Sequence, residues 1–135
     1  MKRLIPALVL VFAGVALADD AKGIDGKWTI ESVTKNGKAD ANWAGGSREN
    51  TGDTYTMASK AGKSFTGKMK VDAAKKTVDL MPSDGTYKGK TLLGIYSLEG
   101  DTLKICFAEP GKDRPAKLES AEDSGVTLAV HKKAK

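Results

Sequence analysis

The sequence predicts an all-β domain, an antiparallel meander that closes into a small barrel of about seven or eight strands. Short segments of alternating apolar and polar residues follow one another at close spacing, and turn signals such as Asn36-Gly37 separate them. No segment of useful length in the mature chain shows helical periodicity. Barrel closure pairs the two edge strands that an open meander would leave exposed. A two-sheet β-sandwich would have the same strand count and is the alternative.

Residues 1–18 have the pattern of a cleaved signal peptide. Lys2 and Arg3 form a basic start, an apolar run follows, and Ala16-Leu17-Ala18 supplies the small residues that a signal peptidase recognises. The apolar run is shorter than the roughly 20 residues of a membrane-spanning helix. We therefore expect an exported protein, periplasmic or secreted, with residues 19–135 as one mature domain and no transmembrane segment after cleavage.

The net charge argues against a nucleic-acid-binding protein, and the cysteine content excludes a fold held by internal disulfides. Loss of Lys2 and Arg3 lowers the formal net charge by two, from +5 to +3. The remaining basic residues are spread among acidic ones, whereas a nucleic-acid-binding protein shows a dense basic face, so we expect no nucleic-acid partner. Cys106 is the only cysteine, so no internal disulfide can form. We interpret it as a small buried apolar side chain rather than as a reactive thiol.

The first strand is predicted at residues 26–33, where Trp28 and Ile30 alternate with polar residues before the Asn36-Gly37 turn. Residues 38–52 are rich in Gly, Asn, Ala and Ser and are interpreted as a long loop. Further strands are predicted at 54–57, 65–71, 77–81, 93–98, 102–107 and 126–131. Gly67, inside one of them, indicates a bend or a close backbone approach.

The C-terminal half contains the clearest hairpin. Glu99-Gly100-Asp101 connects its two strands and has the composition of a tight turn. Residues 118–124 are ambiguous and are interpreted as a short edge strand. In the last strand, Val126, Leu128 and Val130 form one apolar face.

A family resemblance spans nearly the whole mature chain. It is carried by Ile24, Gly26, Trp28, Asn36-Gly37-Lys38, Val71-Asp72, residues 75–80, the run Gly94–Cys106, Arg114-Pro115 and residues 126–132. On these residues the sequence resembles the planctomycete-type lipocalin-like domain family. Ala74 and Lys132 depart from its pattern, in a turn and near the terminus. The resemblance implies a lipocalin-like barrel in a periplasmic or envelope setting, and it brings no catalytic or binding residues.

The residues that could act in catalysis or bind a metal ion do not indicate an enzyme. His131 is the only histidine, so no histidine cluster can hold a metal ion, and no cofactor is expected. A nucleophilic pair of Cys106 and His131 would require the two side chains to meet across the barrel, and we disfavour it. We expect no catalytic residues and no enzymatic activity.

The candidate ligand-binding residues are Trp43, Arg48, Tyr96 and Arg114. Each arginine is expected either to hold an anionic ligand through its planar fork or to pin its loop by an ion pair or carbonyl bonds. Trp43 is expected to act as a lid, to contact a partner or to cap the core.

Two functions fit these expectations. The first is a module that binds a small apolar or amphipathic molecule inside the barrel, which requires a cavity of a few hundred Å³. The alternative is a structural or protein-interaction domain of the cell envelope, with a protein partner and a barrel interior filled by side chains.

Overall fold

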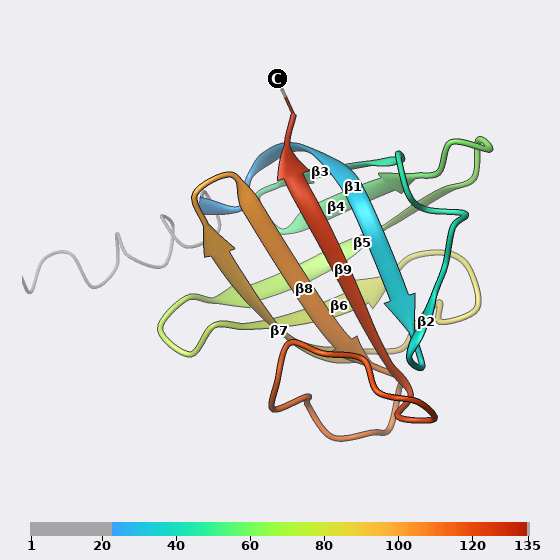
Figure 1. Cartoon of the computed structure of the whole chain (residues 1–135). Coiled ribbons are helices and arrows are strands. Elements are labelled where there is room, and N and C mark those ends of the chain that lie inside the picture. The colour runs from blue at the N-terminus through green and yellow to red at the C-terminus, as the bar shows by residue number, and fades with distance from the viewer. Residues whose placement is uncertain (1–22, 135) are drawn as a thin grey trace, which may run out of the picture.

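The computed structural model describes residues 23–134, which form a closed antiparallel β-barrel (Figure 1). The strands are β1 (Gly26–Lys35), β2 (Lys38–Ala39), β3 (Ser47–Thr51), β4 (Thr54–Ala58), β5 (Ser64–Asp72), β6 (Thr77–Pro82), β7 (Leu92–Glu99), β8 (Thr102–Ala108) and β9 (Val126–Lys133). Pairing of β1 with β9 closes the barrel, and the two-residue β2 is an extra strand beside β1. The predicted all-β barrel is confirmed, and the sandwich alternative is wrong. The predicted signal peptide lies outside the described residues.

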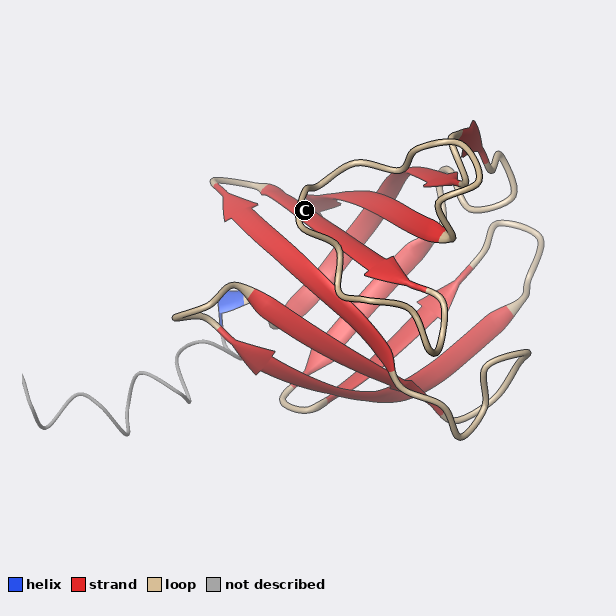
Figure 2. Cartoon of the chain, turned by 90° about the horizontal axis from the view of Figure 1, so that it is seen from below, coloured by secondary structure: helices blue, strands red, loops and turns tan. Residues whose placement is uncertain are grey.

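Strand β1 closes the barrel because it pairs on both of its sides. Its first four residues pair with β3, and most of its length pairs with β9. The register with β9 shifts between Ile30 and Ser32, which is a β-bulge. The bulge changes the phase of the strand, so that Val33 is buried and Ser32 is exposed. The view from below shows the strands wrapped around a shared interior (Figure 2).

Two strands, the two-residue β2 and the five-residue β3, lie where the sequence predicts only a loop. Strand β3 falls within residues 38–52, and its sequence, SRENT, contains no apolar residue. Its buried positions are Arg48 and Asn50, which pair across the sheet with Met57 and Tyr55. Apolar periodicity cannot detect such a strand, because its inward side chains are polar. The short edge strand predicted at residues 118–124 is wrong, because these residues belong to the loop between β8 and β9.

The last strand faces the interior with the side that the apolar pattern did not mark. Leu103 pairs with His131 and Ile105 pairs with Ala129, and all four side chains are buried in the barrel. Val126, Leu128 and Val130 have the opposite phase and are only half-buried on the outer side. His131 therefore lies inside the barrel, on the less apolar face of β9.

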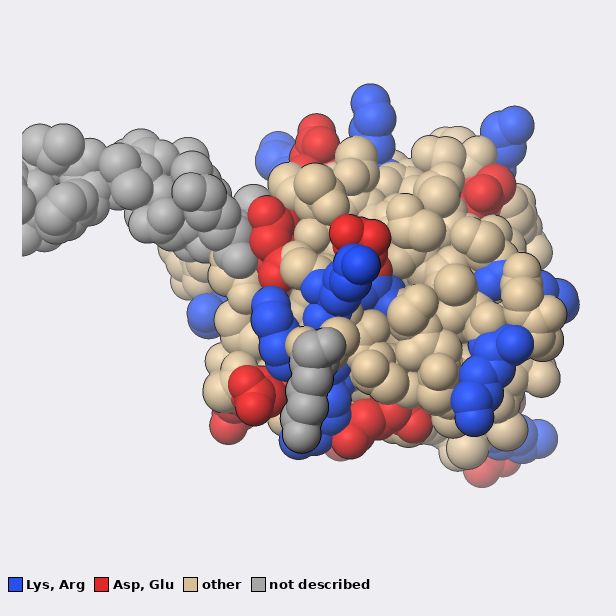
Figure 3. Space-filling model, turned by 90° about the horizontal axis from the view of Figure 1, so that it is seen from above, with Lys and Arg blue, Asp and Glu red and all other residues tan. Residues whose placement is uncertain are grey.

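Trp28 closes the end of the barrel where β1 begins. Its indole Nε1 donates a hydrogen bond to the Ile24 carbonyl oxygen at 2.9 Å, and both residues are almost fully buried. The Lys133 ammonium lies 4.8 Å from the Trp28 ring centroid, which adds a cation–π contact at the outer rim. The aromatic ring thus plugs this end with a satisfied polar group. The face of the molecule seen from above carries both signs of charge, interspersed (Figure 3).

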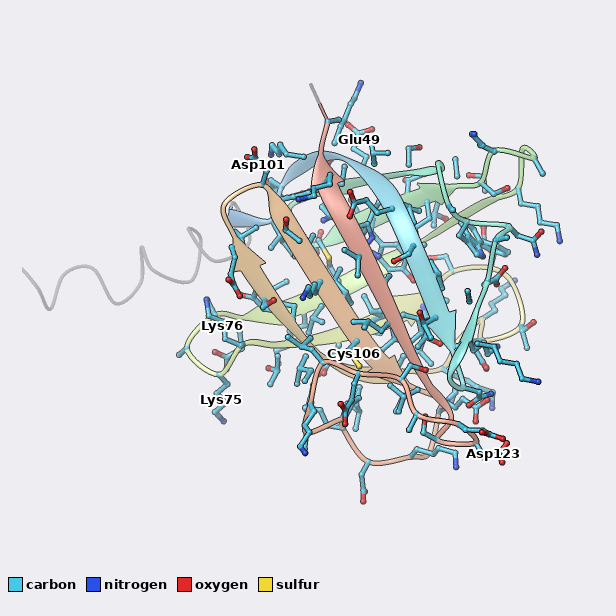
Figure 4. All side chains as sticks on the ribbon, viewed as in Figure 1. Glu49, Lys75, Lys76, Asp101, Cys106 and Asp123 are labelled. Atoms are coloured by element: carbon cyan, nitrogen blue, oxygen red, sulfur yellow. The ribbon has the colours of Figure 1, made fainter. Side chains whose placement is uncertain are left out.

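The loop of residues 109–125 packs on the outside of the barrel wall. It covers Cys106, which is fully buried although its side chain points away from the interior (Figure 4). The Cys106 Sγ lies 3.5 Å from the Lys117 carbonyl oxygen and 3.6 Å from that of Glu119. Burial raises the pKa of the Cys106 thiol. Cys106 is therefore a small buried side chain, as the sequence predicts.

Candidate functional site

A cavity of about 260 Å³ opens at the end of the barrel opposite Trp28. Aromatic and aliphatic side chains dominate its wall. They are Val33, Trp43, Tyr55, Met57, Phe65, Pro82, Tyr87, Leu92, Phe107 and Ala129. The polar residues that also line it include Lys35, Asp40, Asp84, Thr86 and Thr127. An apolar wall with a few polar groups is the usual composition of a small-molecule site.

Trp43 and Phe65 form an aromatic contact at this cavity, with ring centroids 5.6 Å apart. The turn that carries Trp43 is bonded to β1, because the Gly45 amide donates to the Ile30 carbonyl oxygen at 2.8 Å. Gly85, which also lines the cavity, approaches Phe65 so closely that a Cβ at this position would lie 2.9 Å from the Phe65 Cε1. Backbone contacts therefore hold both rings in place.

Deeper in the barrel than the cavity, Arg48 projects from β3 into the interior and is only 2% exposed. Its Nε donates to Asn50 Oδ1 at 2.8 Å, and its Nη1 contacts the Met57 sulfur at 3.6 Å. The guanidinium carbon lies 4.6 Å from the Tyr55 ring centroid. Nη2 is buried without a hydrogen-bond partner. Within residues 23–134, no carboxylate pairs with this arginine.

Asn50 orients the arginine. Its Nδ2 donates to the Ile24 carbonyl oxygen at 2.8 Å, so the amide must present Oδ1 to Arg48. Burial lowers the pKa of Arg48 to about 10, which still leaves the guanidinium charged near neutral pH. Burial also raises the pKa of Tyr55, so the phenol is neutral and does not offset that charge. The barrel interior thus contains an uncompensated positive charge.

His131 is the second polar group of the interior and is fully buried. Its Nδ1 lies 3.0 Å from the Leu103 carbonyl oxygen, and a carbonyl only accepts, so Nδ1 carries the proton. Nε2 has no hydrogen-bond partner and offers a lone pair. Burial, and secondly the positive charge of Arg48, lower the pKa of His131 to about 3. The imidazole is therefore neutral at physiological pH.

The structure separates the four candidate residues of the sequence analysis. Trp43 lines the cavity, and Arg48 lies directly behind the cavity residues Tyr55 and Met57. The prediction that Arg48 sits in a loop is wrong, because it belongs to β3. Tyr96 is 4% exposed in the main core cluster and is not among the residues that line the cavity.

Arg114 lies outside the barrel wall, in the loop that covers Cys106. Its Nη1 donates to the Gly94 carbonyl oxygen at 2.8 Å and lies 2.8 Å from Asp79 Oδ1. These contacts pin the loop to β6 and β7, which is one of the two roles expected from the sequence. Arg114 and the cavity residues are on opposite sides of the wall.

The other chemistry considered from the sequence finds no support in the arrangement. Cys106 is on the outer face of β8, whereas His131 pairs with Leu103 on the inner face, so the two side chains do not meet. Residues 23–134 contain no group of three or more metal-ligating side chains. The same residues contain no helix long and apolar enough to cross a membrane.

No family model matches the chain, and no curated protein matches it. Among solved structures, the chain is similar to a DUF4847 family protein from Bacteroides vulgatus, with 12% sequence identity and a TM-score of 0.47. The match covers 82% of this chain and 94% of that protein. This similarity is too low to support a conclusion about the chain, and the lipocalin-like family resemblance stays a prediction.

Proposed function

We propose that this domain binds a small amphipathic molecule in the cavity at the open end of its barrel, and that it does so after export. The proposal rests on an apolar cavity of about 260 Å³ at one end of the barrel. Trp28 closes the other end. This volume lies just below the usual range for ligand sites, about 300–1,000 Å³, which favours a small or partly inserted molecule. We assign no reaction to the site.

Apolar contact supplies part of the binding free energy. Burial of about 150 Å² of ligand surface would contribute roughly 4 kcal/mol at about 25 cal/mol per Å². The lost translational and rotational freedom costs at least about 4 kcal/mol. Contacts with rings such as Trp43 and Phe65 alone would therefore give weak binding, and useful affinity requires a polar anchor as well.

The alternative is an envelope interaction domain with a filled interior. It would leave the open end without a cavity, since large side chains would meet at the barrel axis. The rings of Trp43, Phe65 and Tyr87 instead surround a space. That arrangement supports the binding module.

The test uses one substitution inside the cavity and the same substitution outside it. Thr127 lines the cavity, and Thr56 is exposed between Tyr55 and Met57 on β4. We expect N-phenyl-1-naphthylamine, an uncharged fluorescent probe, to bind the wild-type protein and Thr56→Phe with equal affinity. Thr127→Phe fills the cavity and should weaken binding tenfold or more. Circular dichroism melting verifies that each variant is folded.

Two results would contradict the proposal. One is the absence of probe binding to the folded wild-type protein. The other is equal binding to Thr127→Phe and Thr56→Phe, which would place the probe elsewhere on the surface.

A further inference from the structure

The charge on Arg48 has a cation–π contact with the Tyr55 ring but, within residues 23–134, no anionic partner that neutralises it. A buried ion is costly unless it is paired and hydrogen-bonded, and structural arginines normally have a carboxylate or carbonyl partner. Arg48 has one amide oxygen on Nε and one thioether sulfur, a weak acceptor, on Nη1. Nη2 has none. The edge of the guanidinium that carries both η nitrogens is thus free of any strong acceptor.

That edge lies next to the cavity. Met57, which contacts Nη1, is the cross-strand partner of Arg48 and lines the cavity. On strand β9, Ala129 lines the cavity, and His131 lies two residues further along on the same face. Two residues along a strand span roughly 7 Å. Arg48 and His131 therefore form a polar layer directly below the apolar one.

We propose that the molecule bound in the cavity carries a single carboxylate, which displaces the Met57 sulfur and binds both η nitrogens of Arg48. The inference rests on the proposed function and specifies the ligand class. A bidentate pair of carboxylate and guanidinium gives each η nitrogen a strong acceptor and neutralises the charge. Methionine is unbranched and flexible, so its side chain can move aside without distorting the strand.

The single charge of Arg48 also discriminates between anions. A carboxylate leaves the interior neutral, because His131 is uncharged and no other buried cation is found in residues 23–134. A phosphate dianion would bring a second negative charge into the barrel without a partner, which is costly. The lone pair of His131 Nε2 additionally accepts a hydrogen bond, from a ligand hydroxyl or from one water beside the carboxylate.

The experiment compares three probes that share an octyl chain and differ in the head group. Calorimetric titration of the full mature chain with octanoate, 1-octanol and octyl phosphate gives the three affinities. We expect octanoate to bind at least tenfold more tightly than 1-octanol and than octyl phosphate. In Arg48→Met the preference for octanoate over 1-octanol should disappear. Arg114→Met removes an arginine outside the barrel and should keep the preference.

A second measurement on the wild-type protein covers the case in which Arg48→Met does not fold. Octanoate should shift the nuclear magnetic resonance signals of the Arg48 side-chain nitrogens, and 1-octanol should not. Unshifted signals on octanoate binding would show that only buried water meets Arg48, and would overturn the inference.

The failures of the two proposals differ. If octanoate and 1-octanol bind equally and Arg48→Met changes neither, the carboxylate site is wrong and the cavity proposal stands. Tighter binding of octyl phosphate would overturn the preference for a single charge. If neither the octyl compounds nor the uncharged naphthylamine bind, the proposed function itself fails.

Discussion

Burial of His131 makes the stability of the domain depend on pH, and His131→Asn isolates the effect. The pKa of His131 is about 3 in the folded protein, against about 6.5 in an unfolded chain. Between these values the unfolded state binds one more proton, so the free energy of unfolding rises with pH across this window and levels off above it. Asparagine retains a donor near the Nδ1 position for the Leu103 carbonyl oxygen and does not titrate.

The size of the effect follows from the two pKa values. Each pH unit within the window changes the unfolding free energy by about 1.4 kcal/mol per proton. At pH 4.5, two units below the unfolded value, His131 should lower the stability by about 3 kcal/mol relative to its contribution at neutral pH. The carboxylates of the chain titrate in both proteins, so their effects cancel in the difference between wild type and variant.

Urea unfolding at pH 4, 5, 6 and 7, without ligand, measures that difference. The substitution also changes packing, but packing shifts the variant by a similar amount at every pH. The test is therefore the slope of the difference against pH, expected near 1.4 kcal/mol per unit below pH 6. Parallel curves for wild type and His131→Asn would instead show that the imidazole reaches solvent in the folded protein.

Three further predictions concern the frame around the site. Trp28→Ala opens the closed end and should lower the unfolding free energy by about 3–5 kcal/mol in urea; a loss below about 1 kcal/mol would mean that the ring is not the plug. Gly85→Ala should destabilise more than Gly62→Ala, since both glycines have positive φ but only Gly85 has Phe65 within contact distance; equal melting temperatures would contradict the close approach. The Cys106 thiol should react with Ellman's reagent only on unfolding, because it is fully buried and burial raises its pKa; labelling of the native protein within the mixing time would count against that burial.

The sequence predicts the barrel better than it predicts the contents of the barrel. The hairpin at 93–98 and 102–107 corresponds to β7 and β8, because alternation and a turn signal both mark it. Strand β3 escapes detection, since its inward side chains are Arg48 and Asn50. Polar residues on an inward face have the same sequence signal as a loop.

In the last strand, β9, apolar periodicity also fails to identify the inward face. The outer face of β9 is more apolar than its inner face, because Leu128 pairs with Cys106, which the loop of residues 109–125 covers. Apolar periodicity marks a strand face that other parts of the protein cover, and in β9 both faces are covered. The inward position of His131 therefore required the register of β8 and β9. Trp43 and Arg48 could be named from their residue types, but their positions around one cavity depend on contacts far apart in the chain.

A crystal structure of the protein with octanoate would show whether the cavity and Arg48 form one binding site. We predict that the octyl chain lies against Trp43 and Phe65, and that the carboxylate oxygens lie about 2.7–2.9 Å from both η nitrogens of Arg48. The Met57 sulfur should have left Nη1. An interior without octanoate, with the Met57 sulfur still on Nη1 and only water at Nη2, would contradict the account.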